Sequence, residues 1–200
     1  PDDRHFRRER YDHLRPRIEA IKAEERARGV FRVLTHGAIE ERYGFDTIVR
    51  AIAHARRRVP GIQFRFMGAG EYLGEVKRLV DELGVADCVT HLGFVPFDQM
   101  VEEILLADVC VVAVKKNAYS VLVHTNKMFE YMALERPVIA SRLGSVAAYA
   151  PEGALLFFEP GDHEDLAAKL TWAAAHPEEL ARQVTTATRM YEVLQWEKEK

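Results

Sequence analysis

Residues 124–133 combine side chains that can bind a phosphorylated ligand. Thr125 or Asn126 can cap a helix and leave its first-turn N–H groups free for an anion, which the helix dipole also favours. Lys127 adds a full positive charge in that turn. Glu130 lies three residues further along the same face, and its carboxylate can accept two hydrogen bonds from a ribose diol. An ordinary surface pair of Lys127 with Glu130 explains the same residue types, so the residues alone leave both interpretations open.

Other ligand-binding motifs fit the sequence less well. The Gly-Ala-Gly run at residues 68–70 begins like a dinucleotide fingerprint, but Leu73 occupies the position of its third glycine. No segment of the sequence has the P-loop spacing, which argues against an ordinary NTPase. The eight histidines lack metal-binding spacing, so we expect no protein-bound metal. His36 and His124 are interpreted as loop histidines with structural partners.

The composition is that of a globular domain. With 200 residues and 48% hydrophobic content, the chain can bury a sizeable core. Its net charge of −3 offers no general attraction for nucleic acid or anionic membranes. Positive and negative charges nearly cancel between residues 2 and 28, which predicts a solvent-exposed helix face with many salt bridges. Cys88 and Cys110 lie in apolar runs and are expected to be free thiols in a reducing compartment.

The order of the expected elements indicates a doubly wound α/β fold. From residue 30 to about 175, short apolar runs alternate with amphipathic helices, an order that builds a parallel, Rossmann-like sheet covered on both faces. Strands are expected at residues 31–35, 62–67, 88–92, 109–114, 137–141 and 154–158. Such sheets bind ligands outside the carboxyl ends of their strands, so the loops that follow the strands hold the candidate site. No apolar run is long enough to span a bilayer.

Motifs along nearly the whole chain resemble those of the group 1, retaining glycosyltransferases of GT-B fold, the glycogen-synthase-like family 4. The matching positions are Gly37, 42–46, 67–71, 92–96, 107–109, 127–133, 137–141, 159–162 and Trp196. The resemblance implies that this chain is the carboxyl-terminal half of a GT-B fold, which binds a nucleotide sugar. It also implies that a missing amino-terminal domain supplies the acceptor site.

The resemblance assigns roles to the residues of the candidate site. It implies that Glu130 binds the ribose, that the backbone at Thr125 and Asn126 holds the distal phosphate, and that residues 93–95 line the base pocket. The predicted nucleotide-sugar-binding residues are Gly37, Arg42, Gly68, Gly93, Phe94, Val95, Thr125, Asn126, Lys127 and Glu130.

Two cations of the family pattern are displaced in this sequence. Family members usually carry an Arg directly after the first-loop glycine and a Lys directly before the second, and these positions are Ala38 and Tyr43 here. Arg42 and Lys127 are the predicted substitutes, because either can reach a diphosphate and Arg binds phosphate oxygens bidentately.

A third departure affects the sugar end of the site. The first glutamate of the family pattern is replaced by Leu122, and we predict that Asn117 or Tyr119 contacts the donor sugar instead. The catalytic residues are left unassigned. This departure keeps open a catalytically inactive nucleotide-binding or scaffolding module as an alternative. A sugar-nucleotide epimerase of GT-B fold is the other alternative, although these loops lack the carboxylates that it would need.

The sequence therefore predicts the donor-binding domain of a glycosyltransferase that moves a hexosyl unit from a UDP- or GDP-sugar to a glycan, lipid or small-molecule acceptor. Residues 1–29 are expected to form an interdomain linker and lead-in helix, residues 30–176 the nucleotide-sugar-binding domain, and residues 177–200 a helix leading back toward the missing domain. Alone, the chain is expected to bind donor without turnover. No cofactor and no nucleic-acid partner are expected. The expected location is the cytoplasm, with a peripheral position at the inner face of the plasma membrane as an option.

Overall fold

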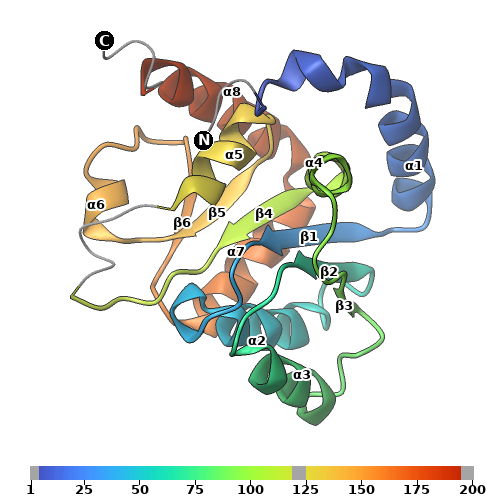
Figure 1. Cartoon of the computed structure of the whole chain (residues 1–200), viewed down its shortest axis with the longest axis vertical. Coiled ribbons are helices and arrows are strands. Elements are labelled where there is room, and N and C mark those ends of the chain that lie inside the picture. Colours follow the sequence, from blue (N-terminus) through green and yellow to red (C-terminus); the bar gives the residue numbers. More distant parts are fainter. Residues whose placement is uncertain (1–4, 119–124, 195–200) are drawn as a thin grey trace.

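A computed structural model describes residues 5–118 and 125–194 of the chain. Within these ranges, parallel strands form one sheet with the order β3-β2-β1-β4-β5-β6 (Figure 1). The strands are β1 (Phe31–His36), β2 (Ile62–Met67), β3 (Val89–His91), β4 (Val109–Val112), β5 (Val138–Ser141) and β6 (Leu156–Phe158). Every strand expected from the sequence is present, with bounds that differ by at most two residues, and the doubly wound α/β class is confirmed.

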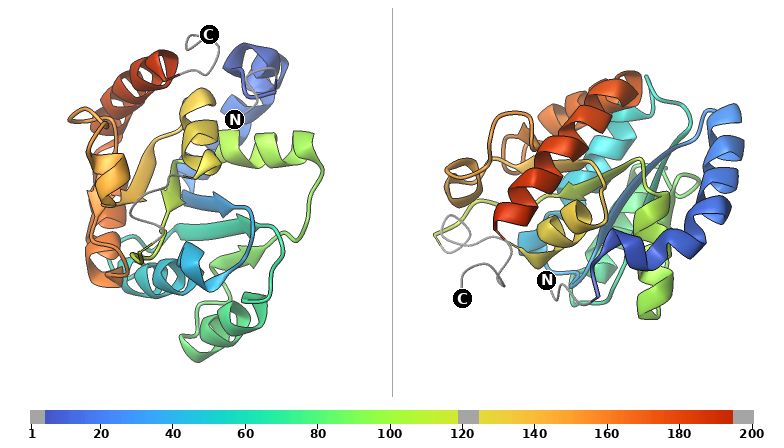
Figure 2. Two further views of the ribbon diagram at one scale, coloured as in Figure 1. Left: turned by 60° about the vertical axis from the view of Figure 1, so that its left-hand side comes forward. Right: turned by 90° about the horizontal axis from the view of Figure 1, so that it is seen from above.

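Helices cover both faces of this sheet (Figure 2). One core lies between the sheet and α1, α4, α5 and α8, and a second lies between the sheet and α2, α3 and α7. The helices of the described ranges are η1 (Arg8–Leu14), α1 (Arg15–Ala27), η2 (Glu41–Tyr43), α2 (Phe45–Ala55), α3 (Leu73–Glu82), α4 (Phe97–Leu106), α5 (Asn126–Ala133), α6 (Gly144–Ala147), α7 (His163–Ala175) and α8 (Pro177–Val193).

Strands β1 and β4 lie at the centre of the sheet, and the strand order reverses between them. All four residues of β4 are buried, because helices cover this strand on both faces. The run of Val109 to Val112 is therefore apolar throughout rather than alternating. The loops after β1 and β4 consequently leave the sheet at its topological switch point, where doubly wound folds bind their ligands.

The prediction of a solvent-exposed face with many salt bridges for the amino-terminal helix is wrong for two of its residues. Lys22 and Glu25 of α1 are 6% and 8% exposed. The Nζ atom of Lys22 lies 2.9 Å from Glu25 and 2.7 Å from Asp108, just before β4. Glu25 also pairs with Arg32 of β1, whose Nη1 lies 3.2 Å from Glu103 of α4. We call these five residues the α1 charge network; it joins α1 to the sheet and to α4.

Two further expectations concern thiols and membranes. Cys88 and Cys110 are free and buried, as predicted. Burial raises the pKa of the Cys110 thiol, which keeps it protonated and lets it pack as a small apolar group. Across residues 5–118 and 125–194, no helix combines the length and the apolar character needed to cross a membrane.

Candidate functional site

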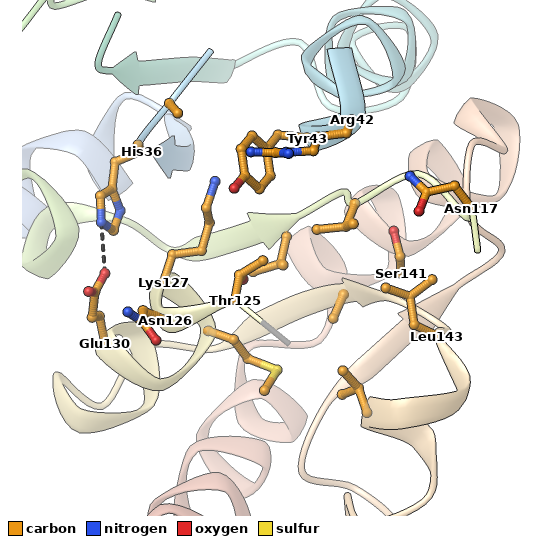
Figure 3. A pocket seen from close by; sticks show the side chains of 17 residues that line it. His36, Arg42, Tyr43, Asn117, Thr125, Asn126, Lys127, Glu130, Ser141 and Leu143 are labelled. Carbon is orange, nitrogen blue, oxygen red and sulfur yellow. Dashed lines mark hydrogen bonds and ion pairs between the residues drawn. The ribbon is translucent and has the colours of Figure 1, made fainter. Parts of the chain in front are cut away.

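A pocket of about 550 Å³ lies at the carboxyl ends of β1, β4 and β5 (Figure 3). His36, Val112 and Ser141, the last residues of these strands, are part of its lining. The pocket brings together seven residues that the sequence singled out, namely Gly37, Arg42, Asn117, Thr125, Asn126, Lys127 and Glu130. Its position at the strand-order reversal is the one that the fold predicts for a ligand site.

The amino-terminal end of α5 forms one wall of the pocket. Thr125 occupies the N-cap position with an extended backbone, but its hydroxyl makes no capping hydrogen bond. That hydroxyl is buried and has no hydrogen-bond partner among the described residues. In the first turn of α5, the N–H of Met128 donates to the Thr125 carbonyl at 3.3 Å. The N–H groups of Asn126 and Lys127 have no acceptor within the helix, and the helix dipole adds partial positive charge there. This wall therefore presents donors and positive potential to the pocket.

Lys127 extends from the first turn of α5 into the pocket, towards Tyr43 (Figure 3). Its Nζ atom lies 4.4 Å from the centroid of the Tyr43 ring, a cation–π distance, and a Cβ added at Gly37 would be 3.5 Å from it. Within the described ranges, no carboxylate lies within ion-pair distance of this ammonium. Burial lowers the pKa of Lys127 from 10.5 to about 8, against the opposing charges of Glu130 and Glu40. The alternative of an ordinary surface pair of Lys127 with Glu130 is therefore wrong.

Glu130 is instead hydrogen-bonded to His36. The Nε2 atom of His36 lies 2.9 Å from Oε2 of Glu130, and Nδ1 lies 2.9 Å from the hydroxyl of Tyr131. The expectation that His36 has structural partners is confirmed, but His36 is the last residue of β1 rather than a loop residue, and one of its partners is a predicted site residue. The sequence offers one signal for this role, which is the position of His36 at the end of a central strand.

Arg42 and Tyr43 of η2 form the opposite wall. The Arg42 guanidinium lies 5.1 Å from the centroid of the Tyr43 ring and 2.8 Å from Glu40, and its side chain is half exposed. Lys127 reaches the space beside Gly37 and Tyr43. Asn117 and Ser141 line the far side of the pocket in Figure 3, and the Ser141 hydroxyl is buried without a hydrogen-bond partner in the described parts of the chain.

Gly68 and residues 93–95 do not line the pocket. The N–H of Gly68 donates to the carbonyl of Gly93 at 2.8 Å, and a Cβ at Gly68 would overlap the carbonyl oxygen of Gly37. Gly68 also has a φ of +125°, which favours glycine. Gly68 thus packs between Gly93 and the loop that follows β1 at Gly37, on the side of this loop that does not line the pocket. Phe94 is 91% exposed, outside the pocket.

Some predicted residues lie outside the part of the chain that the structure describes. They are Tyr119, Leu122, His124 and Trp196. Their predicted roles stay predictions. The assignment of a donor-sugar contact among the described residues rests on Asn117 alone.

One group of side chains away from the pocket has metal-ligand types. In the described ranges, ligand atoms of His54 on α2 and of His163 and Glu164 on α7 all lie within 4.8 Å of one another. His54 and Glu164 are exposed, and such exposed groups are common without a metal. The described lining of the pocket instead combines the cations Arg42 and Lys127 with one carboxylate, Glu130.

The fold and the pocket define a Rossmann-like α/β domain with a ligand site at the switch point of its sheet. The family model of the group 1 glycosyl transferases matches residues 30–176. The chain therefore belongs to the group 1 glycosyltransferases. Its parallel sheet flanked by helices also matches the solved structures of GT-B glycosyltransferases.

Curated relatives match parts of the chain. A GDP-mannose-dependent alpha-(1-6)-phosphatidylinositol monomannoside mannosyltransferase of Mycobacterium tuberculosis is 43% identical over 68 residues, which cover 34% of this chain and 18% of that protein. The protein of the same name from Mycolicibacterium smegmatis is 31% identical over 116 residues, 57% of this chain and 29% of that protein. The matched parts are thus less than a third of the length of these relatives.

Two solved structures show the likeness of fold. Anabaena Alr3699/HepE in complex with UDP and glucose has a TM-score of 0.73 and 16% identity, covering 88% of this chain and 47% of that one. The catalytic domain of cholesterol-alpha-glucosyltransferase from Helicobacter pylori has a TM-score of 0.70 and 18% identity, covering 82% of this chain and 99% of that one. At these identities the comparison concerns the fold alone.

Proposed function

We propose that the pocket binds the diphosphate and ribose of a UDP- or GDP-sugar. We further propose that the chain is the carboxyl-terminal, donor-binding domain of a retaining glycosyltransferase that transfers a hexosyl unit. The observation that carries this proposal is the Lys127 ammonium. It lies in the pocket at the start of α5, without a carboxylate partner among the described residues, and its pKa is lowered to about 8 by burial. A bound anion would supply the missing counter-charge.

The diphosphate is proposed to lie between the start of α5 and η2. Lys127 and the first-turn N–H groups approach from one wall, and Arg42 approaches from the other. The buried Thr125 hydroxyl is a further donor without a partner in the described ranges. Together these groups stabilise the negative charge that grows on the leaving diphosphate during transfer, and they do so without a metal ion.

The ribose is proposed to lie over Glu130, at the other end of the pocket. Oε2 of Glu130 accepts a hydrogen bond from His36, which leaves Oε1 to accept from the ribose hydroxyls. On this arrangement the sugar extends from the diphosphate towards Asn117 and Ser141, which line the far side of the pocket. The epimerase alternative gains no support, because Glu130 is the one carboxylate in the described lining of the pocket.

A further domain outside this chain is proposed to supply the acceptor, a glycan, a lipid or a small molecule. The curated relatives support this, since the chain matches less than a third of their length. The chain alone is then expected to bind donor without transferring it, because no acceptor is held beside the anomeric carbon. A cytoplasmic location, with an option of peripheral contact at the inner face of the plasma membrane, belongs to the same proposal.

GDP-mannose is the first donor to test. The two mycobacterial relatives are named for their dependence on it, and one of them is 43% identical over its matched segment. UDP is the alternative, because Anabaena HepE is solved with UDP and glucose.

Isothermal titration of the chain with GDP, UDP and GDP-mannose tests the proposal. We expect binding of at least one of them, weakened about tenfold or more by Lys127→Ala and by Glu130→Ala, since each removes a charged hydrogen-bonding group. Lys77→Ala, on the exposed side of α3, is the matched control and is expected to bind like the wild type. A folded wild type that binds none of these ligands, or two variants that bind unchanged, would refute the proposal. Donor-dependent transfer by the full-length protein separates an enzyme from an inactive module.

A further inference from the structure

His36 connects the central strand of the sheet to Glu130. It is the last residue of β1 and is 8% exposed, with its ring at the edge of the pocket (Figure 3). Its backbone N–H donates to the Tyr131 hydroxyl at 3.1 Å, and its Nδ1 lies 2.9 Å from the same hydroxyl. Its Nε2 lies 2.9 Å from Oε2 of Glu130. One histidine thus contacts both neighbouring residues of α5.

The hydrogen bonds around the ring assign its tautomer. The Glu130 carboxylate can only accept, so Nε2 of His36 carries a proton and donates it. The Tyr131 hydroxyl accepts the backbone N–H of His36, and its own proton has Nδ1 and the Thr35 side chain as partners. Burial raises the pKa of Tyr131 well above its ordinary value, so the phenol keeps this proton. When Nδ1 accepts from this phenol, the ring presents its proton on Nε2 to Glu130.

This arrangement fixes a side chain that is otherwise flexible. A free glutamate side chain loses rotamer entropy when a ligand immobilises it. Here β1, through His36, holds Oε2 before any ligand arrives. Oε1 of Glu130 has no hydrogen-bond partner within the described ranges, so the orientation imposed by His36 decides where that oxygen points.

We propose that His36 is a positioning residue that orients the Glu130 carboxylate for the ribose hydroxyls, with Tyr131 holding the ring. This inference rests on the proposed function, in which Glu130 binds ribose. It predicts that discrimination between ribonucleotides and 2′-deoxynucleotides depends on His36, although His36 itself does not contact the nucleotide. Supporting hydrogen-bond partners of this kind lock the geometry of a site more than they add contacts of their own.

The experiment measures the Kd of GDP and of 2′-deoxy-GDP, or of UDP and 2′-deoxy-UDP, by isothermal titration of the whole chain. We expect the wild type to bind the ribonucleotide about tenfold more tightly, the effect of one hydrogen bond to a charged group. In His36→Ala the preference is expected to fall towards one, mainly because the ribonucleotide binds more weakly. Tyr131→Phe, which frees the ring, is expected to reduce the preference in part. His54→Ala, at an exposed position on α2, is the control that keeps it.

A pair of conservative variants guards against misfolding of His36→Ala. The amide of His36→Gln reaches about as far as Nε2 and can still donate to Glu130, whereas that of His36→Asn reaches about as far as Nδ1. We expect the ribose preference to be retained in His36→Gln and lost in His36→Asn.

The outcomes separate the two proposals. A folded wild type that binds no nucleotide refutes the proposed function itself. A wild type that binds both nucleotides equally, or a set of folded His36 variants that keep the wild-type preference, overturns the role of His36 while leaving nucleotide binding in place.

Discussion

Lys127→Met is expected to stabilise the chain and at the same time to weaken nucleotide binding. Burial lowers the pKa of Lys127 from 10.5 to about 8. At about 1.4 kcal/mol per pH unit, keeping the ammonium charged in the fold costs about 3 kcal/mol relative to the unfolded chain at pH 7. The cation–π contact with Tyr43 returns about 1 kcal/mol. Methionine is apolar and of similar length. Lys127→Met should therefore raise the free energy of unfolding by about 1–2 kcal/mol, which corresponds to an increase of about 2–8 °C in Tm.

The pH dependence distinguishes this cause from a general improvement in packing. Between pH 8 and 10.5 the unfolded chain binds more protons at Lys127 than the folded chain does. The stability of the wild type therefore rises with pH across this window, and the cost of the charge, complete below pH 8, disappears above 10.5. Methionine has no proton to bind. The difference in Tm between variant and wild type should thus shrink between pH 7 and pH 10.

Thermal unfolding followed by circular dichroism at both pH values provides the measurement, with Lys77→Met on the exposed side of α3 as control. Titration with GDP or UDP should show the variant binding about 10- to 100-fold more weakly, since a charged contact is lost. Two results would refute the argument that the buried ammonium destabilises the fold. One is a folded Lys127→Met with a Tm at or below that of the wild type at pH 7, and the other is a difference in Tm that is unchanged at pH 10.

Three other substitutions test the supporting structure. Glu135 follows α5 with a φ of +55°, a left-handed conformation that costs an ordinary residue about 1 kcal/mol, so Glu135→Gly should raise the free energy of urea unfolding by about that amount; a decrease would contradict this. Glu103→Gln removes the negative charge that pairs with Arg32 on β1 and Arg65 on β2, so it should lower the free energy of urea unfolding by about 3 kcal/mol. A decrease of less than about 1 kcal/mol would show that these ion pairs contribute little to stability. Gly68→Ala should lower both Tm and nucleotide affinity, because its Cβ would displace the Gly37 carbonyl; unchanged values would show that the loop adapts.

The fold could be predicted from the sequence because its signals are local. An apolar run such as that of β4 reads as a strand buried on both faces, and the alternation of strands with amphipathic helices indicates a parallel sheet. The start of α5 is also predicted from a local signal, because a threonine or asparagine can cap a helix and Thr125 does occupy the N-cap position. Lys127 and Glu130 followed from their places in that helix, and both line the pocket.

The parts of the site that escaped prediction depend on contacts between distant segments. His36 and Glu130 are 94 residues apart, and their hydrogen bond follows from how α5 packs beside the end of β1. Likewise, the local charge pattern places Lys22 on a solvated face, since its partner Asp108 is 86 residues away in the sequence. The resemblance alone places residues 93–95 at the pocket. They lie outside it because the loop that holds them follows β3, the edge strand of the sheet.

The α1 charge network also bears on where this domain should be considered to begin. The family match starts at residue 30, so a protein trimmed to that limit would lack Lys22 and Glu25. Asp108 would lose its lysine and Arg32 one of its two carboxylates, while the face of the sheet that α1 covers would meet water. The domain as defined by the family match is therefore one helix, α1, shorter than the domain as defined by the ion pairs of the α1 charge network. Expression of this domain by itself, or its transplantation into a chimaeric transferase, should take the longer limit.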